Sequence, residues 1–289
     1  MRRIYRKLKK ICNCLINRLK KKVPVYIPVL EGEFLKGRMA LITGGTSGIG
    51  YSIAEAFIRN GANVVITGRS QERIDNSVVS LSKKYPSAFI TGIVMDNSDI
   101  GNLEKKWNEI IEKVGTKKID ILVNNAGVSN NGDFKKVKEI EYDEVLDTNM
   151  KGCYFLCQIV SQYMVKNQVK GNILNIVSSS AIRPSTSPYT ISKWGLRGFT
   201  VGLAKLLAPY EIVVNGIAPG PTATPMLKHV YQDDLTNIRN PIGRLATAEE
   251  IANLSVMLTS SLGKMVVGDI LYATGGAGII TFDDVDYNF

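Results

Sequence analysis

Apolar runs and helically spaced apolar residues alternate along most of the chain. The run 39–42 (Met-Ala-Leu-Ile) indicates a buried strand, and apolar residues at helical spacing follow over 49–60. Further strands are indicated at 63–69, 87–96, 119–127, 171–178 and 212–218 and within 262–274. Helical patterns cover 70–84, 98–114 and 139–167, the segment from residue 189, and 248–260. This alternation predicts an α/β fold, a doubly wound parallel sheet of about seven strands with helices on both faces.

A glycine-rich turn joins the first predicted strand to the first predicted helix. Its sequence is Thr43-Gly-Gly-Thr-Ser-Gly-Ile-Gly50. Such a unit aims free backbone N–H groups and a helix dipole at an anion. Gly44 would let the chain turn, Gly48 would let a pyrophosphate approach the backbone, and Gly50 would let the helix lie close to the strand. The turn therefore predicts a dinucleotide site in a Rossmann-like sheet, although three glycines also occur in ordinary strand-to-helix turns.

The end of the second predicted strand bears on which dinucleotide binds. An acid at this point accepts hydrogen bonds from the 2′-hydroxyl of the adenosine ribose and repels a 2′-phosphate. Here the position is Gly68, and Arg69 follows it. The missing acid and a guanidinium suited to phosphate favour NADP(H), with NAD(H) as the second candidate. The alternative is that Arg69 is simply solvated at a strand end.

Tyr189 and Lys193 lie four residues apart on one face of a predicted helix. A phenol normally titrates near about 10, too high for acid–base chemistry at neutral pH. An adjacent ammonium stabilises the phenolate and suits it to exchange a proton with a substrate. Many helices carry this pair on their surface. Here it follows a strand-end serine, Ser178, in a chain with a dinucleotide turn, and the combination favours the catalytic interpretation.

Charge is concentrated at the N-terminus. The 289 residues include 36 Lys or Arg and 26 Asp or Glu, a formal net charge of +10. Residues 1–22 contain ten of the basic residues and no acid, so the rest of the chain is neutral. The apolar residues of this segment fall on one narrow stripe, which predicts a basic amphipathic helix. It suits an anionic membrane surface or docking on the body or a neighbouring subunit.

Other roles for this segment are less favoured. A cleaved targeting peptide would be rich in serine, which the segment lacks, and no aromatic or base-reading pattern supports nucleic-acid binding. Prolines interrupt residues 23–37, which predicts an extended linker. The Rossmann-fold domain is expected over 38–280 and a short tail over 281–289.

Composition narrows the remaining classes. The apolar content of 45% supports a sizeable core, and no apolar run is long enough to span a bilayer, so a soluble body is expected. Four cysteines and one histidine lack zinc-site spacing and no disulfide framework is evident. A reducing, cytoplasmic compartment is therefore expected, with peripheral attachment to the inner face of a membrane if the N-terminal helix binds lipid. Cys153 and Cys157 are interpreted as small buried apolar residues.

Together these motifs resemble the short-chain dehydrogenase/reductase family, over about residues 36–278. The resemblance rests on Thr43-Gly-x-x-x-Gly-x-Gly50, Asp96, Asn124-Asn-Ala-Gly127, Asn149, Ser178, Tyr189-x-x-x-Lys193 and Pro219-Gly220, in that order. It implies an NAD(P)-dependent oxidoreductase that interconverts a carbonyl and a secondary alcohol of a small molecule by hydride transfer. It also implies a homo-oligomer, a dimer or tetramer assembled through the long helices.

The resemblance implies roles for individual residues. Tyr189 would be the general acid or base, Lys193 would assist it and hold the nicotinamide ribose, Ser178 would orient the substrate oxygen, and Asn149 would help to hold a water relay. Tyr189 and Lys193 would also contact the cofactor. The other expected cofactor contacts are Thr43, Gly44, Thr46, Ser47, Gly48, Ile49, Gly50, Arg69, Asp96, Asn97, Asn124, Ala126, Gly127, Pro219, Gly220, Thr222 and Thr224.

Two features depart from the family pattern. Ser178, Ser179 and Ser180 compete for the catalytic position, and Ser178 best fits the strand ending; Ala181 stands where a glycine is common.

Segment 221–246 is expected to cover the substrate. The alternative class of function is a non-catalytic dinucleotide-binding sensor or scaffold, recruited to a membrane by the N-terminal helix.

Overall fold

The computed structural model describes residues 32–129, 134–184, 186–226, 235–237 and 239–279. The predicted N-terminal helix at 1–22, the linker up to residue 31 and the predicted tail at 281–289 lie outside the described residues.

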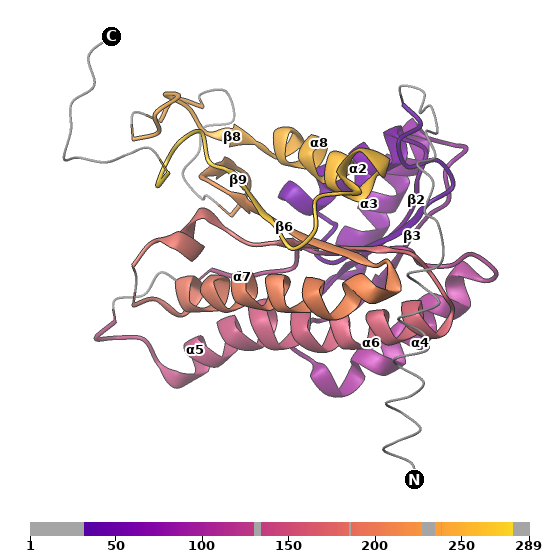
Figure 1. The fold of residues 1–289 in the computed structure, drawn as a ribbon, viewed down its shortest axis with the longest axis horizontal. Helices are drawn as coiled ribbons and strands as arrows, with labels where there is room; N and C mark the ends of the chain where they lie inside the picture. The colour runs from indigo at the N-terminus through magenta and orange to yellow at the C-terminus, as the bar shows by residue number, and fades with distance from the viewer. Residues whose placement is uncertain (1–31, 130–133, 185, 227–234, 238, 280–289) are drawn as a thin grey trace, which may run out of the picture. The chain divides into compact units, whose positions relative to one another are not determined.

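Seven parallel strands form the central sheet, in the order β3-β2-β1-β4-β5-β6-β9 (Figure 1). Their bounds are β1 Met39–Ile42, β2 Asn63–Gly68, β3 Ile90–Val94, β4 Ile121–Asn124, β5 Asn172–Ile176, β6 Val213–Pro219 and β9 Ile270–Ala273. The prediction of a doubly wound parallel sheet of about seven strands is confirmed. The first predicted strand coincides with β1. All four of its residues are buried, as expected for a strand covered on both faces, so the apolar run itself marks the bounds of the strand.

Helices cover both faces of this sheet, as Figure 1 shows. One face carries α2 (Gly48–Arg59), α3 (Gln71–Lys84) and α8 (Ala248–Thr259). The other carries α4 (Leu103–Val114), α5 (Glu139–Leu146), α6 (Gly152–Lys166) and α7 (Pro188–Leu207). No helix in the described ranges is both long and apolar enough to cross a bilayer.

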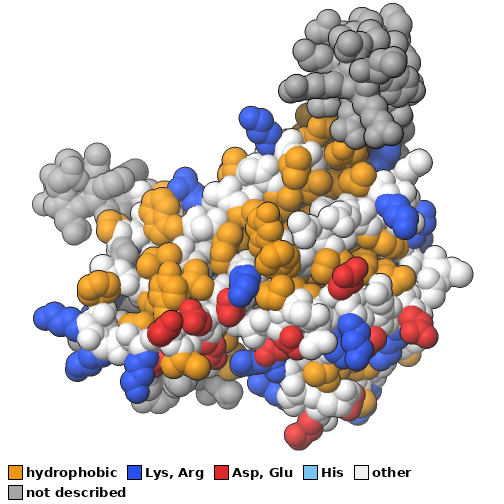
Figure 2. All heavy atoms as spheres, turned by 90° about the horizontal axis from the view of Figure 1, so that it is seen from below, with side chains coloured by type: hydrophobic (Ala, Val, Ile, Leu, Met, Phe, Trp, Pro, Cys, Tyr) orange, Lys and Arg blue, Asp and Glu red, His pale blue; other side chains and the backbone are white. Residues whose placement is uncertain are grey.

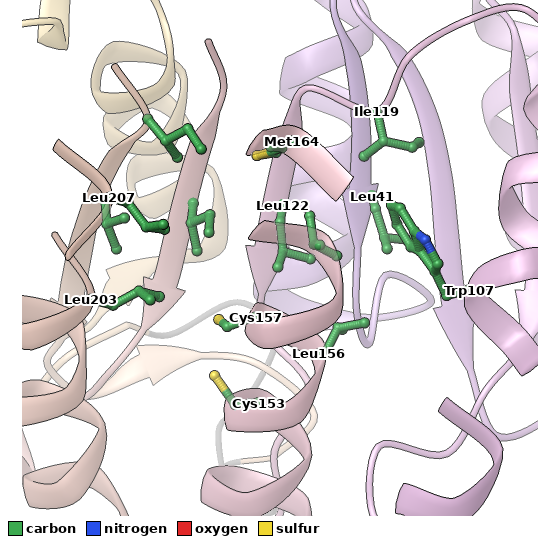
Figure 3. Close-up of a cluster of buried hydrophobic side chains, with 14 of the residues drawn as sticks. Leu41, Trp107, Ile119, Leu122, Cys153, Leu156, Cys157, Met164, Leu203 and Leu207 are labelled. Carbon is green, nitrogen blue, oxygen red and sulfur yellow. The ribbon is translucent and has the colours of Figure 1, made fainter. Parts of the chain in front are cut away.

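The sheet separates two hydrophobic clusters. Met39 and Leu41 of β1 pack into the cluster beneath α4, α6 and α7, whereas Ala40 and Ile42 pack into the cluster beneath α2 and α8. This division follows from the alternation of side chains along a strand. Figure 3 shows the first cluster, which includes Trp107, Leu122, Leu156, Met164 and Leu207. Cys153 and Cys157 lie in it on successive turns of α6, free and buried as predicted.

Three segments differ from the sequence-based expectations. The helical pattern 139–167 is divided by a π-helical turn at Asp147–Lys151, because Asn149 bonds to a neighbouring loop as described below. Two short strands, β7 (Thr222–Ala223) and β8 (Ala246–Thr247), pair outside the main sheet. A two-residue strand has no periodicity that a sequence could reveal.

The last part of the predicted extended linker is folded onto the domain. Residues 34–37 form turns, and Leu35 is fully buried in the cluster beneath α2 and α8. The backbone N–H of Leu35 donates to the carbonyl of Asn60 over 2.9 Å. Burial of this leucine explains why the segment is not extended, since removing a large aliphatic side chain from water contributes roughly 1.5–3 kcal/mol.

Candidate active site

The turn between β1 and α2 has an open helix N-terminus. Gly44 and Gly48 have φ of 64° and 53°, a backbone conformation that residues other than glycine rarely adopt. The N-cap residue of α2, Ser47, makes no side-chain capping bond, and the first turn of the helix contains no acid. The first N–H groups of α2 therefore remain available to an anion, as a pyrophosphate site requires.

Asn125 ties the glycine turn to the end of β4. Its amide nitrogen donates to the carbonyls of Thr43 and Gly44, over 3.0 and 3.1 Å. In return, the Thr43 hydroxyl accepts the backbone N–H groups of Asn125 and Ala126, each over 3.0 Å. The sequence analysis did not include Asn125 among the site residues, although the pair of asparagines after the strand is its signal.

Asn124, in contrast, points into the interior. Its amide nitrogen donates to the Asn175 side chain over 2.9 Å and to the Cys157 sulfur over 3.1 Å. Asn175 in turn donates to the Thr200 hydroxyl over 2.9 Å. Burial raises the pKa of the Cys157 thiol well above its usual value, so this cysteine stays neutral. This buried polar network joins β4, β5, α6 and α7 beneath the site.

The predicted adenosine end lies at the carboxyl ends of β2 and β3. The Thr46 side chain lies close to Gly68 at the end of β2. A Cβ added at Gly68 would be 3.1 Å from the Thr46 methyl carbon. Arg69 is exposed. One carboxylate oxygen of Asp96 accepts the N–H and hydroxyl of Ser98, over 2.9 and 2.8 Å. The Asn97 amide oxygen is buried without a hydrogen-bond partner in the described part of the chain. A buried amide oxygen without a hydrogen-bond donor is consistent with a site that binds a polar ligand.

Tyr189 and Lys193 occupy successive turns at the start of α7. The Ser187 hydroxyl caps this helix, and Pro188 begins it. The ammonium nitrogen of Lys193 is 5.7 Å from the centroid of the Tyr189 ring. Lys193 is 5% exposed, and its nitrogen donates to the Ile176 carbonyl at the end of β5 over 2.9 Å. No carboxylate of the described residues forms an ion pair with this buried cation.

Ser178 follows β5 directly and lies at the same edge of the sheet as Lys193. Its hydroxyl oxygen accepts the N–H of Ser180 over 3.1 Å and caps the short 3-10 helix Ser179–Ile182. Ser178 and Ser179 are both buried, at 8% and 5% exposed. Because the Ser178 hydroxyl acts only as an acceptor in this cap, its O–H remains able to donate a hydrogen bond, which suits it to bind a substrate oxygen.

Asn149 connects three parts of the site. It is 2% exposed, and its amide oxygen and nitrogen bond to the N–H and carbonyl of Val128, over 2.8 and 2.9 Å. Its nitrogen also donates to the Ser192 hydroxyl over 3.1 Å, and Ser192 donates to the Tyr189 carbonyl over 2.7 Å. The sequence analysis missed Ser192, whose only signal is a hydroxyl between Tyr189 and Lys193. These bonds fix the first turn of α7 against the loop after β4.

The loop after β6 completes the site on the other side. Gly220 N–H donates to the Ala273 carbonyl over 2.9 Å, and the Thr222 hydroxyl donates to the Gly220 carbonyl over 2.9 Å. Thr224 lies against the glycine turn, because a Cβ added at Gly48 would be 3.4 Å from its side chain. The glycine turn after β1 and the loop after β6, which both contain predicted cofactor contacts, thus lie side by side at this edge of the sheet.

The predicted residues do not all form one cluster. The strand order places β2, which Arg69 directly follows, three strands from β5, a separation of about 14 Å at the usual spacing of roughly 4.8 Å. Arg69, Asp96 and Asn97 therefore form one end of the site, and Ser178, Tyr189 and Lys193 form the other. An extended dinucleotide fits such a span along the carboxyl ends of the strands.

Comparison with known proteins agrees with this geometry. The family model for short chain dehydrogenase matches residues 38–235. The chain is 36% identical over 249 residues to a 3alpha-hydroxysteroid dehydrogenase of Mediterraneibacter gnavus, with 84% of this chain and 98% of the relative covered. It is 35% identical over 251 residues to the 3-oxoacyl-(acyl-carrier-protein) reductase FabG of Aquifex aeolicus, with the same 84% and 98% coverage.

Solved structures show the same fold. A short chain dehydrogenase from Burkholderia cenocepacia in complex with NADP is 30% identical with a TM-score of 0.75, over 84% of this chain and 98% of that one. A 3-ketoacyl-(acyl-carrier-protein) reductase from Brucella melitensis complexed with NADH is 29% identical with a TM-score of 0.76, over 85% and 100%. The chain therefore belongs to the short-chain dehydrogenase/reductase family and is an NAD(P)-dependent oxidoreductase of carbonyls and alcohols.

Proposed function

We propose that this protein is an NADP(H)-dependent oxidoreductase that interconverts a ketone and a secondary alcohol, with Tyr189 as general acid or base. The observation that carries the proposal is the buried ammonium of Lys193, 5.7 Å from the centroid of the Tyr189 ring. A cation beside a phenol stabilises the negative charge that develops on the phenol oxygen while its proton is transferred to a substrate.

The residues of the chain would divide the work as follows. A bound nicotinamide supplies or accepts the hydride. The Tyr189 hydroxyl would donate its proton to the carbonyl oxygen as negative charge develops there, and would take a proton from the alcohol in the reverse direction. Ser178 would donate a hydrogen bond to the same oxygen and hold it in place. Lys193 would stabilise the phenolate, and Asn149 would help to hold the water relay through which the phenol regains its proton.

The test of this function is turnover. The protein is mixed with NADPH and a panel of ketones that includes 3-oxosteroids and 3-oxoacyl thioesters, the substrate classes that the names of the relatives suggest. We expect ketone-dependent loss of the absorbance of the reduced cofactor. Cofactor binding with no turnover of any ketone, and no oxidation of the matching alcohols, would favour the sensor or scaffold alternative.

Cofactor preference follows from Arg69, which stands at the end of β2 where no acid is present. We expect NADPH to bind more tightly than NADH. Arg69→Ala should raise the Kd for NADPH roughly 10- to 100-fold, because a charge-assisted bond to the 2′-phosphate is lost. The Kd for NADH should change by less than about twofold. Fluorescence titration with both cofactors measures this, and an equal loss for both would remove Arg69 from the 2′-phosphate site.

We also propose that a second copy of the chain covers the outer face of α5, α6 and α7. Figure 2 shows hydrophobic side chains gathered on this helical face. Those exposed on the three helices include Ile140, Tyr142, Tyr154, Ile191, Trp194, Val201 and Leu206. Exposed apolar patches of this kind mark interaction surfaces. Light scattering should give a multiple of the 31.7 kDa chain mass, and Val201→Glu should lower it. A wild-type monomer at micromolar concentration would contradict the proposal.

For the N-terminal segment we propose attachment to an anionic membrane surface, on the basis of its sequence. Ten basic residues within positions 1–22 and an apolar stripe combine electrostatic attraction with burial in the interface. In flotation assays the full-length protein should rise with vesicles that contain phosphatidylserine and not with neutral ones. Protein lacking residues 1–22 should stay at the bottom. If both proteins stay unbound, the membrane proposal is wrong.

A further inference from the structure

A polar pocket lies next to the end of the site that holds Ser178, Tyr189 and Lys193. It has a volume of about 560 Å³ and is lined by the loop after β5, the long loop after β6 and the segment after β9. Arg183 comes from the first of these, Pro221 and Arg239 from the second, and Ala277 from the third. Because these loops all leave the carboxyl ends of neighbouring strands, the pocket opens at the same edge of the sheet as Ser178.

The backbone of Arg183 is hydrogen-bonded to residues close in sequence to Ser178 and Lys193. Its N–H donates to the Ser180 carbonyl over 3.1 Å, two residues beyond Ser178. Its carbonyl accepts the indole N–H of Trp194 over 3.1 Å, and Trp194 directly follows Lys193. The position of this arginine relative to the reacting groups is thus set by hydrogen bonds rather than by a free loop.

The Arg183 guanidinium lies against Gly278 in the chain after β9. A Cβ added at Gly278 would lie 2.9 Å from the Arg183 Nε and 3.1 Å from one of its terminal nitrogens, so only a glycine admits the group here. In the loop after β6, the Asn237 side chain accepts the N–H of Arg239 over 3.1 Å. Next to it, the buried Asn240 anchors the loop through a 3.1 Å bond to the Thr274 carbonyl.

Among the described residues, no carboxylate compensates the positive charge that the two arginines bring to the pocket. Both side chains are exposed, and neither forms an ion pair with a carboxylate of the described residues. No acid is among the described residues that line the pocket. Two arginines that line one pocket suit a carboxylate or phosphate, which guanidinium groups bind through paired N–H donors.

The cofactor does not account for this charge. The 2′-phosphate of NADP would be bound at the end of β2, beside Arg69. In the strand order, β2 is four strands from β6, a separation of about 19 Å at the usual spacing. The arginines therefore stand at the substrate end of the site.

We infer that Arg183 and Arg239 form an anion-binding subsite for the substrate, so that this enzyme acts on a ketone or secondary alcohol that carries a carboxylate or phosphate group. The inference rests on the proposed function for the reacting group of the substrate. The anion subsite itself stands on the pocket and its charge. The carbonyl would lie at Ser178 and Tyr189, and the anionic end would lie in the arginine pocket.

The experiment compares oxo acids of increasing chain length with their neutral methyl esters and with ketones bearing a terminal phosphate, at fixed NADPH. The wild type should reduce at least one of the anionic ketones with a higher kcat/KM than its neutral counterpart. Arg183→Gln and Arg239→Gln should each lower kcat/KM for the anionic ketone roughly 10- to 100-fold, the loss expected for a charged hydrogen bond. Activity on the ester should change by less than about twofold. Relative activity on carboxylate and phosphate ketones identifies which anion the pocket takes.

Arg59→Gln is the matched control, because it removes the same charge from the surface pair with Glu249, away from the pocket. Equal activity of the wild type on acids, phosphates and esters, or an equal loss on all of them in the variants, would overturn the inference. If no ketone is reduced at all, the proposed function fails but the subsite can still be measured. Calorimetric titration with an oxo acid and with inorganic phosphate should then show binding to the wild type and none to the double variant. Absence of binding to the wild type would overturn the subsite.

Discussion

Tyr189→Phe should lower kcat on the order of 10²- to 10⁴-fold, the usual contribution of a general acid or base. The change removes one hydroxyl and keeps the aromatic ring, whose centroid lies 5.7 Å from the Lys193 nitrogen. The bond from Lys193 to the Ile176 carbonyl and the bond from Ser192 to the Tyr189 carbonyl do not involve the phenol, so the local structure should persist. Steady-state kinetics and NADPH titration measure the two effects separately, and the Kd for NADPH should change by less than about threefold.

Tyr210→Phe serves as the control for this prediction. Tyr210 is 52% exposed in the short 3-10 turn Ala208–Tyr210 after α7, and loss of its hydroxyl should leave kcat unchanged. Undiminished turnover by Tyr189→Phe would show that another group transfers the proton. A parallel loss of cofactor binding and turnover would instead indicate that the phenol contributes to cofactor binding or to the local structure.

Gly50→Ala should weaken cofactor binding at least about tenfold and destabilise the fold by roughly 1–3 kcal/mol, the usual cost of overpacking. A Cβ at this position would overlap the Gly44 carbonyl oxygen and the Asn125 amide nitrogen. Asn125 bonds to both Thr43 and Gly44, so the turn cannot move away without breaking those bonds. The glycine turn would then no longer aim its N–H groups at a pyrophosphate. NADPH titration and urea denaturation measure the two effects.

The control is Gly101→Ala, at an exposed glycine whose added Cβ would meet no atom within 4 Å. This change should alter neither the urea midpoint nor the Kd for NADPH. If Gly50→Ala also bound NADPH normally, Gly50 would not be needed for the close contact between α2 and the turn, and the phosphate site would lie elsewhere.

Elements with a strong local signal could be predicted from the sequence. The apolar run of β1, the helix after it and the alternation of later strands and helices reflect burial and periodicity within each segment. The spacing of Tyr189 and Lys193 places both on one helix face for the same reason, because helix geometry depends on neighbouring residues only. The glycine turn is equally local, and its positive φ values at Gly44 and Gly48 are ones that glycine readily allows.

Side-chain partners across the fold could not be predicted in this way. Two adjacent asparagines look alike in the sequence, yet Asn125 holds the glycine turn and Asn124 turns inward to Asn175. Which one faces the turn depends on where β4 ends relative to β1. The π-helical turn at Asn149 likewise depends on bonds to Val128 and Ser192, residues 21 and 43 positions away.

By itself, then, the sequence determined the fold class, the dinucleotide turn, the Tyr189–Lys193 pair and the family resemblance, since each is written in short segments. The tertiary structure alone decided the strand order that separates Arg69 from the catalytic end, the folding of Leu35 into the core, and the placement of Arg183 and Arg239 around one pocket. Those two arginines are 56 positions apart and have no spacing motif. Only parallel strands that end at one edge of the sheet bring their loops together around one pocket.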